Sequence, residues 1–179
     1  MTNGKSRVIM VQMKKQLTIF TTEEESSVYK NCVFTGHRDL GEDFSKSRLK
    51  KTVEALIKAG VTTFYNGMAI GFDLISAETV LSLRKKYPQV KLIACVPCYG
   101  QEKYFSDSDK KRYVKILKKA DETVTLADHY YNGCMQQRDK YMVDRADVMI
   151  AYCNKPTGGA AYTVKLYQKA YPNREIYFI

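Results

Sequence analysis

Three short segments of the sequence combine glycine with polar residues that can bind a phosphate: residues 34–38, 65–78 and 155–163. Glycine leaves backbone N–H groups open to a ligand, and the start of a following helix adds partial positive charge. Each segment follows a short apolar run typical of a β-strand and precedes a run of helical period. This arrangement predicts that the three segments bind the phosphates of one ligand.

The first segment reads Thr35-Gly36-His37-Arg38. Gly36 permits a tight turn, and Arg38 can bind a phosphate or carboxylate through its planar guanidinium group. His37 can act as an acid or base near neutral pH, hydrogen-bond the ligand, or hold the loop. With no partner nucleophile visible, the sequence favours a structural or binding role for His37 over a catalytic one.

The second segment contains Gly67 and Gly71, which let the backbone approach a ligand closely, and an acid near the start of the next helix. Asp73 either caps that helix or accepts hydrogen bonds from a ribose hydroxyl. Glu78 either pairs with a lysine or faces the ligand. If the ligand is hydrolysed, Glu78 is the candidate catalytic carboxylate, with Asp73 as the other choice.

The third segment again places two glycines, Gly158 and Gly159, at a helix start, and Thr157 or Thr163 can add a hydroxyl. A fourth region contributes Arg138, which either reaches the ligand or forms an ion pair within its own helix. The predicted ligand-binding residues are Thr35, Gly36, His37, Arg38, Asn66, Gly67, Ala69, Gly71, Asp73, Glu78, Arg138, Thr157, Gly158, Gly159 and Thr163.

Alternating short apolar runs and helical periods predict the elements that position these residues. The expected strands are 32–35, 62–65, 91–96, 122–126, 148–152 and 175–178, and the expected helices are 45–59, 72–87, 107–120, 135–145 and 159–171. This alternation predicts an α/β, Rossmann-like fold with a mostly parallel sheet and helices on both faces. Right-handed crossovers then bring the turns after the strands to one edge of the sheet.

Composition limits the class of protein. The chain has 179 residues and a formal charge of +10, which predicts attraction to phosphates, although most of the lysines fall on predicted helix faces. Residues 31–179 form the predicted domain, and residues 1–30 an appendage of unknown role. No apolar run is long enough to span a membrane and no signal peptide is visible, so we expect a cytoplasmic protein with no membrane partner.

Five cysteines, an odd number scattered over predicted strands and turns, favour reduced buried thiols over disulfides. Cys95 and Cys98 have the spacing of a redox pair but end a strand instead of opening a helix, so we favour a structural role for them. No second cysteine pair accompanies them, and we expect neither a metal nor a required cofactor.

In these motifs the chain resembles the YpsA-like branch of the SLOG superfamily, which also contains the DNA-processing protein DprA and the LOG phosphoribohydrolases. The resemblance covers residues 31–179. It rests on Thr35-Gly-His-Arg38, Gly67-x-Ala-x-Gly-x-Asp73 with Ala77-Glu78, Pro97-Cys98 with Gln101, Gly133-Cys-Met135, Arg138-x-x-Tyr-Met-Val-Asp144, and Gly158-Gly159 with Thr163.

The resemblance implies a Rossmann-like fold and a nucleotide or nucleotide-derived ligand, such as an ADP-ribose-like molecule, bound across the strand ends. It does not decide whether that ligand is cleaved, sensed or sequestered. Two departures matter: Leu166 stands where LOG hydrolases carry their catalytic acid, and Ala160 replaces a threonine common in this branch.

We therefore expect first a binding module for such a ligand, acting as a sensor or by sequestration. The alternatives are hydrolysis of an N-glycosidic bond with Glu78 as the carboxylate, and binding of single-stranded nucleic acid as implied by the resemblance to DprA. The sequence leaves enzyme activity and homo-oligomer formation open, and leans against the former.

Overall fold

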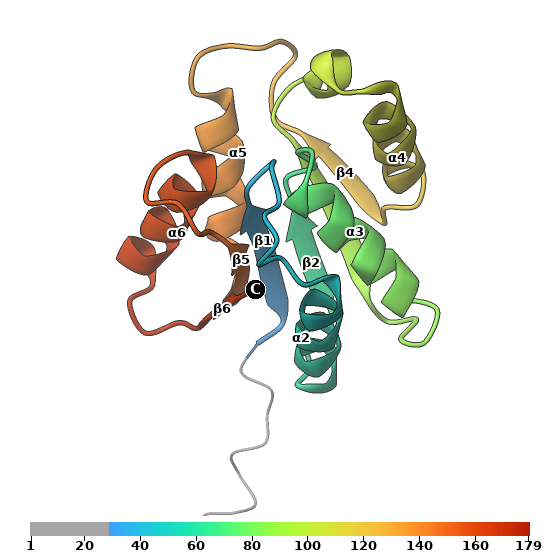
Figure 1. Ribbon diagram of the computed structural model, residues 1–179, viewed down its shortest axis with the longest axis vertical. Coiled ribbons are helices and arrows are strands. Elements are labelled where there is room, and N and C mark those ends of the chain that lie inside the picture. The colour runs from blue at the N-terminus through green and yellow to red at the C-terminus, as the bar shows by residue number, and fades with distance from the viewer. Residues whose placement is uncertain (1–28) are drawn as a thin grey trace, which may run out of the picture.

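Six parallel strands form one sheet within residues 29–179, the part of the chain that the computed structural model describes (Figure 1). The strands are β1 (Asn31–Gly36), β2 (Thr63–Asn66), β3 (Lys91–Val96), β4 (Glu122–Thr125), β5 (Val148–Tyr152) and β6 (Ile176–Phe178). Their order is β4-β3-β2-β1-β5-β6, and every neighbouring pair is parallel. The predicted Rossmann-like α/β fold is confirmed, and β3 and β5 have the predicted bounds.

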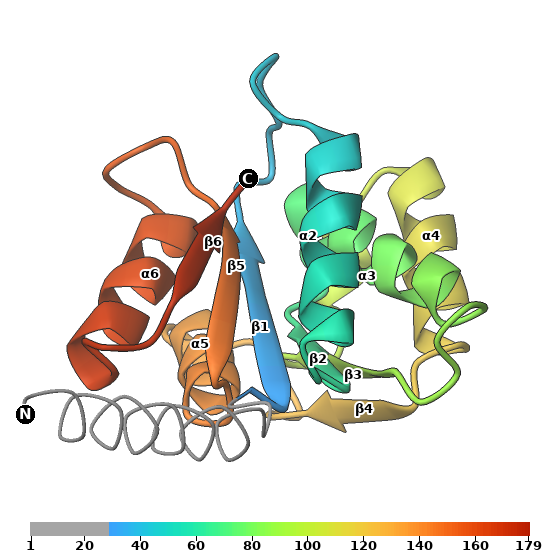
Figure 2. The same ribbon diagram turned by 90° about the horizontal axis from the view of Figure 1, so that it is seen from below.

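Helices cover both faces of the sheet (Figures 1 and 2). They are α2 (Lys46–Lys58), α3 (Phe72–Leu83), α4 (Asp107–Leu117), α5 (Cys134–Val143) and α6 (Gly159–Ala170), with a short 3₁₀ helix η1 (Gln101–Tyr104). Helices α2, α3 and α4 lie on one face, and α5 and α6 on the other. The chain adds strands in one direction from β1 to β4 and then returns to the other side of β1, so right-handed crossovers change face at that point.

The helix boundaries have local causes. The Ser45 hydroxyl accepts a hydrogen bond from the Arg48 N–H at 3.2 Å and caps α2, which lies within the predicted range. Helix α3 ends at Leu83, four residues before the predicted end at Tyr87. Because Tyr87 precedes a proline, Pro88, the helical backbone is disfavoured there and the periodic pattern outlasts the helix.

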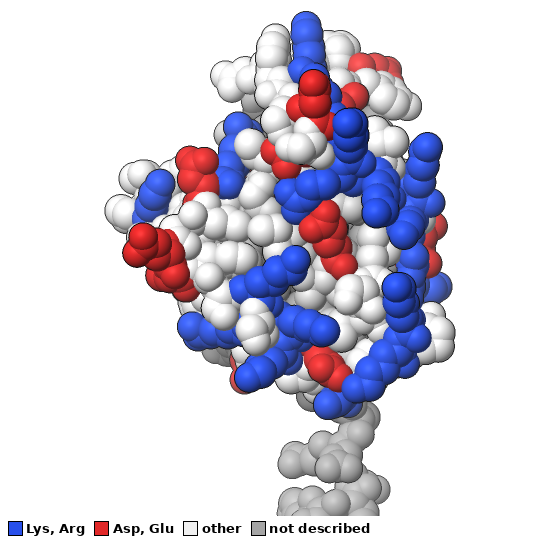
Figure 3. Space-filling view, turned by 45° about the vertical axis from the view of Figure 1, so that its right-hand side comes forward, with Lys and Arg blue, Asp and Glu red and all other residues white. Residues whose placement is uncertain are grey.

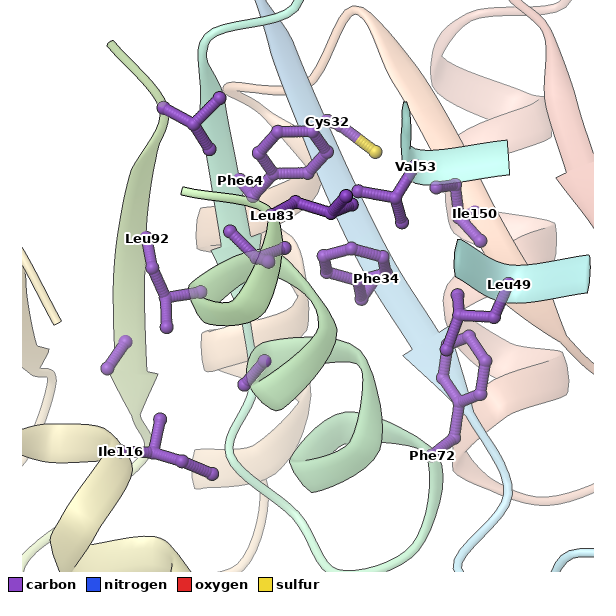
Figure 4. Packing of buried hydrophobic residues seen from close by; sticks show 14 of the residues in the cluster. Cys32, Phe34, Leu49, Val53, Phe64, Phe72, Leu83, Leu92, Ile116 and Ile150 are labelled. Atoms are coloured by element: carbon purple, nitrogen blue, oxygen red, sulfur yellow. The ribbon is translucent and has the colours of Figure 1, made fainter. Parts of the chain in front are cut away.

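Two hydrophobic layers hold the sheet between its helices. Figure 4 shows the layer beneath α2 and α3, where Phe34 of β1 lies beside Phe64 of β2 with ring centroids 5.7 Å apart. Side chains alternate along each strand, so Val33 of β1 points into the other layer, toward α5 and α6. Both layers consist of buried hydrophobic residues, and their packing fixes the strand ends from which the loops extend.

The strand order reverses between β1 and β5, and in open α/β sheets ligands bind outside the carboxyl ends of strands at such a point. No helix among the described residues is long and apolar enough to cross a membrane. The predicted appendage, residues 1–30, falls outside the described residues except for Tyr29 and Lys30.

Candidate functional site

A cavity of about 820 Å³ lies at the carboxyl ends of the strands. Its lining comes from the segments that follow β1, β2, β3 and β4 and from helices α5 and α6, so distant parts of the sequence meet here. Of the predicted residues, it includes Thr35, Gly36, His37, Arg38, Ala69, Asp73, Arg138, Gly159 and Thr163. Asn66, Gly67, Gly71, Glu78, Thr157 and Gly158 are not part of the lining.

Gly36 and Gly71 let the first two predicted segments contact each other. A Cβ on Gly36 would lie 2.4 Å from the Phe72 ring, and one on Gly71 would lie 2.0 Å from the Arg38 carbonyl oxygen. Gly71 also has a φ of +76°, which other residues rarely adopt. The Phe72 N–H donates to the His37 carbonyl at 3.2 Å. Both glycines therefore permit contact between protein segments, whereas the sequence predicted a tight turn at Gly36 and close approach of a ligand at Gly71.

Asn66 is fully buried and supports the start of α3. Its amide nitrogen donates to the Asp73 carbonyl and the Ser76 hydroxyl, each at 2.9 Å. Its amide oxygen accepts from the Met68 N–H at 2.8 Å. Both ends of the amide are thus used within the protein, and Asn66 orders the β2–α3 turn instead of facing the cavity.

Arg138 is a buried cation in the wall of the cavity. Its Nε donates to Asp139 Oδ1 at 2.8 Å, and its Nη1 donates to the Gly67 carbonyl oxygen. A Cβ on Gly67 would lie 2.4 Å from that same nitrogen, so a residue with a side chain would displace the guanidinium group. Burial alone lowers the pKa of Arg138, but the carboxylates of Asp139 and Asp73 outweigh burial and raise it.

Asp73 carries an unsatisfied hydrogen-bond acceptor in the cavity lining. The residue is only 5% exposed. Its Oδ2 accepts from the Ala69 N–H at 3.2 Å, whereas its Oδ1 is buried and has no hydrogen-bond partner among the described residues. Burial raises the pKa of Asp73 to about 7, although the charge of Arg138 acts in the opposite direction. Buried polar atoms without partners are uncommon in folded proteins, so this oxygen stands out among the polar atoms of the lining residues.

Thr163 positions a carboxylate that the sequence analysis missed. Its hydroxyl lies 3.0 Å from Asp139 Oδ2 and 2.9 Å from the Gly159 carbonyl oxygen. Together with the Arg138 bond, this contact engages both oxygens of Asp139. The sequence contained little signal for the ion pair between Arg138 and Asp139, because adjacent residues on a helix do not normally face each other.

His37 connects the first and third predicted segments. Its Nε2 accepts hydrogen bonds from the backbone N–H groups of Asn154 and Lys155, at 3.2 and 3.3 Å. A nitrogen that accepts these bonds carries no proton, which places the imidazole proton on Nδ1. Burial, aided by the charge of Lys155, lowers the pKa of His37 and favours this neutral form. Of the roles that the sequence left open for His37, these contacts correspond to the structural one, in which His37 holds the loop.

The start of α6 is open to the cavity. Gly158 has a φ of +96°, and no atom lies within 4 Å of a Cβ placed on Gly158 or Gly159. Arg38, an exposed residue of the lining, forms no hydrogen bond or ion pair with another described residue. Thr157 is exposed and outside the lining. An anion in the cavity therefore finds an unengaged guanidinium group and an unobstructed helix N-terminus.

Glu78 lies away from the cavity, on the side of α3 that faces α4. Arg112 donates from Nε and Nη2 to the two oxygens of Glu78, at 2.8 and 3.0 Å. Glu78 is therefore engaged by a protein partner and is not part of the cavity lining. The sequence analysis offered a lysine as the alternative partner of Glu78, and the ion pair that forms is instead with an arginine.

Gln101 and three tyrosines also line the cavity and were not among the predicted ligand-binding residues. The Gln101 side chain donates from Nε2 to the Gly67 carbonyl at 3.1 Å, while its Oε1 is buried without a partner among the described residues. The family motif contains Gln101, so a signal for it existed. The exposed tyrosines of the lining are Tyr99, Tyr104 and Tyr130.

The two cysteines with the spacing of a redox pair, Cys95 and Cys98, have raised pKa values. Cys95 and Cys98 are buried free thiols. Burial raises the pKa of Cys95 to about 12, and burial with the neighbouring thiol of Cys134 raises the pKa of Cys98. Both shifts disfavour the reactive thiolate. Within residues 29–179, no group of three or more His, Cys, Asp or Glu residues is placed to hold a metal ion.

Comparison with known proteins places these features in a family. A model described as the YspA SLOG family matches residues 29–179. The UPF0398 protein YpsA of Bacillus subtilis is 26% identical over 144 residues, which cover 76% of this chain and 78% of that protein. An uncharacterized SPbeta prophage-derived protein of the same species, YoqJ, is 26% identical over 145 residues, covering 74% of this chain and 85% of its own length.

Two solved structures of DprA share the fold. The protein from Streptococcus pneumoniae has a TM-score of 0.59 and 14% identity, and the match covers 85% of this chain and 50% of that one. The protein from Helicobacter pylori, described as having a unique single-stranded DNA binding mode, has a TM-score of 0.60 and 18% identity, with coverage of 83% and 64%. This chain thus spans half to just under two thirds of those proteins.

Proposed function

The chain belongs to the YspA SLOG family, and we propose that it binds a nucleotide or nucleotide-derived ligand of the ADP-ribose type in the cavity at the strand ends. The observation that carries this proposal is the buried Oδ1 of Asp73, an acceptor that lacks a partner in the lining of a large cavity. A ribose hydroxyl is the donor of matching chemistry. Gln101 Oε1 is a second buried acceptor of the same kind.

Charge within the cavity favours the anionic part of such a ligand. Arg38 contributes an exposed guanidinium group without a protein partner, and the first residue of α6, Gly159, leaves its backbone accessible. Arg138 adds a buried positive charge from another wall, although Asp139 neutralises part of it. A few charge-assisted hydrogen bonds of this kind yield about 4–8 kcal/mol net, which corresponds to millimolar to micromolar affinity.

Isothermal titration calorimetry with ADP-ribose, NAD and nucleoside monophosphates tests the proposal. We expect binding to at least one of them, and a loss of affinity of roughly fivefold or more in Arg38→Ala, the equivalent of about 1 kcal/mol or more for a charge-assisted bond. Arg48→Ala is the matched control, because Arg48 is also an exposed arginine but lies on α2 outside the cavity. No heat with any of these ligands would refute the proposal, and equal losses in both variants would remove the assigned role of Arg38.

Hydrolysis of the ligand's N-glycosidic bond has less support. Glu78 is engaged by Arg112, and Leu166 occupies the position of the acid that LOG hydrolases carry. Asp73 is the remaining carboxylate of the two that the sequence offered. Release of free base from a nucleoside monophosphate over time, abolished in Asp73→Asn, would establish hydrolysis and change the proposed role from binding to catalysis.

Binding of single-stranded nucleic acid is a second candidate. The observation in its favour is a basic surface on α4, where Lys110, Lys111, Lys115, Lys118 and Lys119 surround a shallow depression. Figure 3 shows lysine and arginine side chains spread over the side of the molecule that carries α2, α3 and α4. The Helicobacter pylori neighbour of the same fold binds single-stranded DNA.

Fluorescence anisotropy with a labelled oligonucleotide tests this candidate. Phosphate contacts predict affinity that falls steeply as salt rises. Replacing Lys111 and Lys115 by glutamate should weaken binding severalfold, whereas Lys50→Glu on α2 should have a smaller effect. Binding that is absent, or that is insensitive to salt, would exclude it.

A further inference from the structure

Three tyrosines are exposed at the mouth of the cavity. The exposed fractions are 68% for Tyr99, 88% for Tyr104 and 67% for Tyr130, and all three residues belong to the lining. In contrast, the charged residues deeper in the cavity, Asp73 and Arg138, are 5% and 7% exposed. The cavity therefore has a polar, charged floor and an aromatic mouth.

These tyrosines are held in place by ordered loops. The Tyr99 N–H donates to the Ala127 carbonyl at 3.3 Å, which joins the loop after β3 to the loop after β4 that carries Tyr130. Tyr104 is the last residue of η1, whose first residue, Gln101, donates to the Gly67 carbonyl, which also accepts from Arg138 of the cavity floor. The mouth and the floor are thus connected by direct contacts.

Exposed aromatic rings of this kind match a planar, partly apolar group in a ligand. A tyrosine ring presents a large flat surface at a low cost in conformational entropy, and nucleobases stack on such rings. Lys103 Nζ lies over one face of the Tyr104 ring, 5.4 Å from the ring centroid, and leaves the other face of that ring for a ligand. Asp73 can accept a hydrogen bond from the ribose of a nucleoside, and the tyrosine rings can stack on its base.

We propose that Tyr104 and Tyr130 form a nucleobase subsite, which stacks on the base of a nucleotide whose ribose and phosphate contact the cavity floor. This proposal rests on the proposed function and extends it, because it makes the base a determinant of affinity. A sugar phosphate without a base then binds only through the floor. The site accordingly discriminates AMP from ribose 5-phosphate, which shares its sugar and phosphate.

Calorimetry with the full chain and these two ligands tests the subsite. We expect AMP to bind at least about fivefold more tightly than ribose 5-phosphate, and Tyr104→Ala and Tyr130→Ala each to weaken AMP binding by roughly five- to a hundredfold. Ribose 5-phosphate binding should stay within about twofold in both variants. The fluorescence of etheno-AMP should report stacking directly, with quenching in the wild type that is lost in the alanine variants.

Two control variants separate stacking from structural effects. Tyr104→Phe keeps the ring and should retain AMP affinity, whereas Tyr162→Ala removes an exposed tyrosine of α6 that is outside the lining and should change nothing. Equal affinity of the wild type for AMP and ribose 5-phosphate would overturn the subsite and leave the proposed function standing. Equal losses for both ligands in Tyr104→Ala would also overturn it. No binding of either ligand, or of ADP-ribose, would refute both.

Discussion

Changing pH should alter ligand affinity through Asp73. Its pKa is raised to about 7, mainly by burial, with Arg138 opposing the shift and Asp139 adding to it. An ionised carboxylate is the better acceptor for a ribose hydroxyl, and with this pKa the ionised fraction rises from about one tenth at pH 6 to about nine tenths at pH 8. We therefore expect the affinity for ADP-ribose to increase about tenfold over this range.

ADP-ribose suits this measurement because its pyrophosphate stays fully ionised between pH 6 and 8, unlike a terminal monophosphate. Calorimetry in two buffers of different ionisation enthalpy should show release of a proton on binding near pH 7. In Asp73→Asn, both the pH dependence and the proton release should disappear, while the amide oxygen still accepts from the Ala69 N–H. If the wild type and the variant show the same pH profile, another group such as His37 is responsible and the assignment fails.

The raised pKa of Asp73 should also make the stability of the fold depend on pH. The folded-state pKa of Asp73 lies above the ordinary value of 3.8, so the folded protein binds more protons than the unfolded chain between these values. Stability from this group is therefore greatest below about pH 4 and falls as pH rises to about 7. The shift of about three pKa units corresponds to roughly 4 kcal/mol. Chemical denaturation of the wild type and Asp73→Asn at several pH values should reveal it as a difference that changes with pH.

Four further substitutions, one of them a control, test the contacts in and around the site. Gly71→Ala should lower the free energy of unfolding by at least about 2 kcal/mol in urea denaturation, because the new Cβ would overlap the Arg38 carbonyl. Gly158→Ala is the control, since Gly158 has a similar φ but open surroundings, and it should lower the free energy of unfolding by only about 1 kcal/mol. Equal losses in the two variants would contradict the assigned role of Gly71. His37→Ala should speed hydrogen exchange at the backbone amides of Asn154 and Lys155, whose hydrogen bonds the His37 side chain accepts. Unchanged protection of these two amides would refute the role of His37 in holding the loop. Glu78→Gln should leave ligand affinity unchanged and cost less than about 1 kcal/mol, since its ion pair is about a third exposed; a large loss of binding in titrations would restore its predicted place in the site.

Local patterns were sufficient to predict the fold. The alternation of strand-length apolar runs with helical periods indicated the order of the elements, and β3 and β5 were predicted to the residue. The errors lay at the ends of elements: the other four strands differ from their predicted bounds by one residue at one or both ends, and α3 stops before the residue that precedes Pro88. The expectation that glycine turns gather at one sheet edge followed from handedness alone, since parallel strands share the direction of their carboxyl ends.

Side-chain partners were not predictable in the same way, because they join segments far apart in the sequence. Arg138 and Gly67 are 71 residues apart, and His37 and Asn154 are 117 apart. Nothing in the local sequence around Glu78 indicates that an arginine 34 residues later lies within reach. The local pattern indicates which chemistry a residue offers, but only the tertiary packing decides which partner the residue contacts.

By itself, the sequence determined the α/β architecture, the positions of the glycine-containing turns and many of the polar groups at the strand ends. The tertiary structure decided which of these groups are consumed within the protein and which remain for a ligand. Gly67 makes room for a guanidinium group, Asn66 orders a turn, and Asp73 is left with a buried acceptor facing no protein donor. The physical reason is that periodicity is a property of neighbouring residues, whereas burial and hydrogen-bond satisfaction depend on every segment that packs around a site.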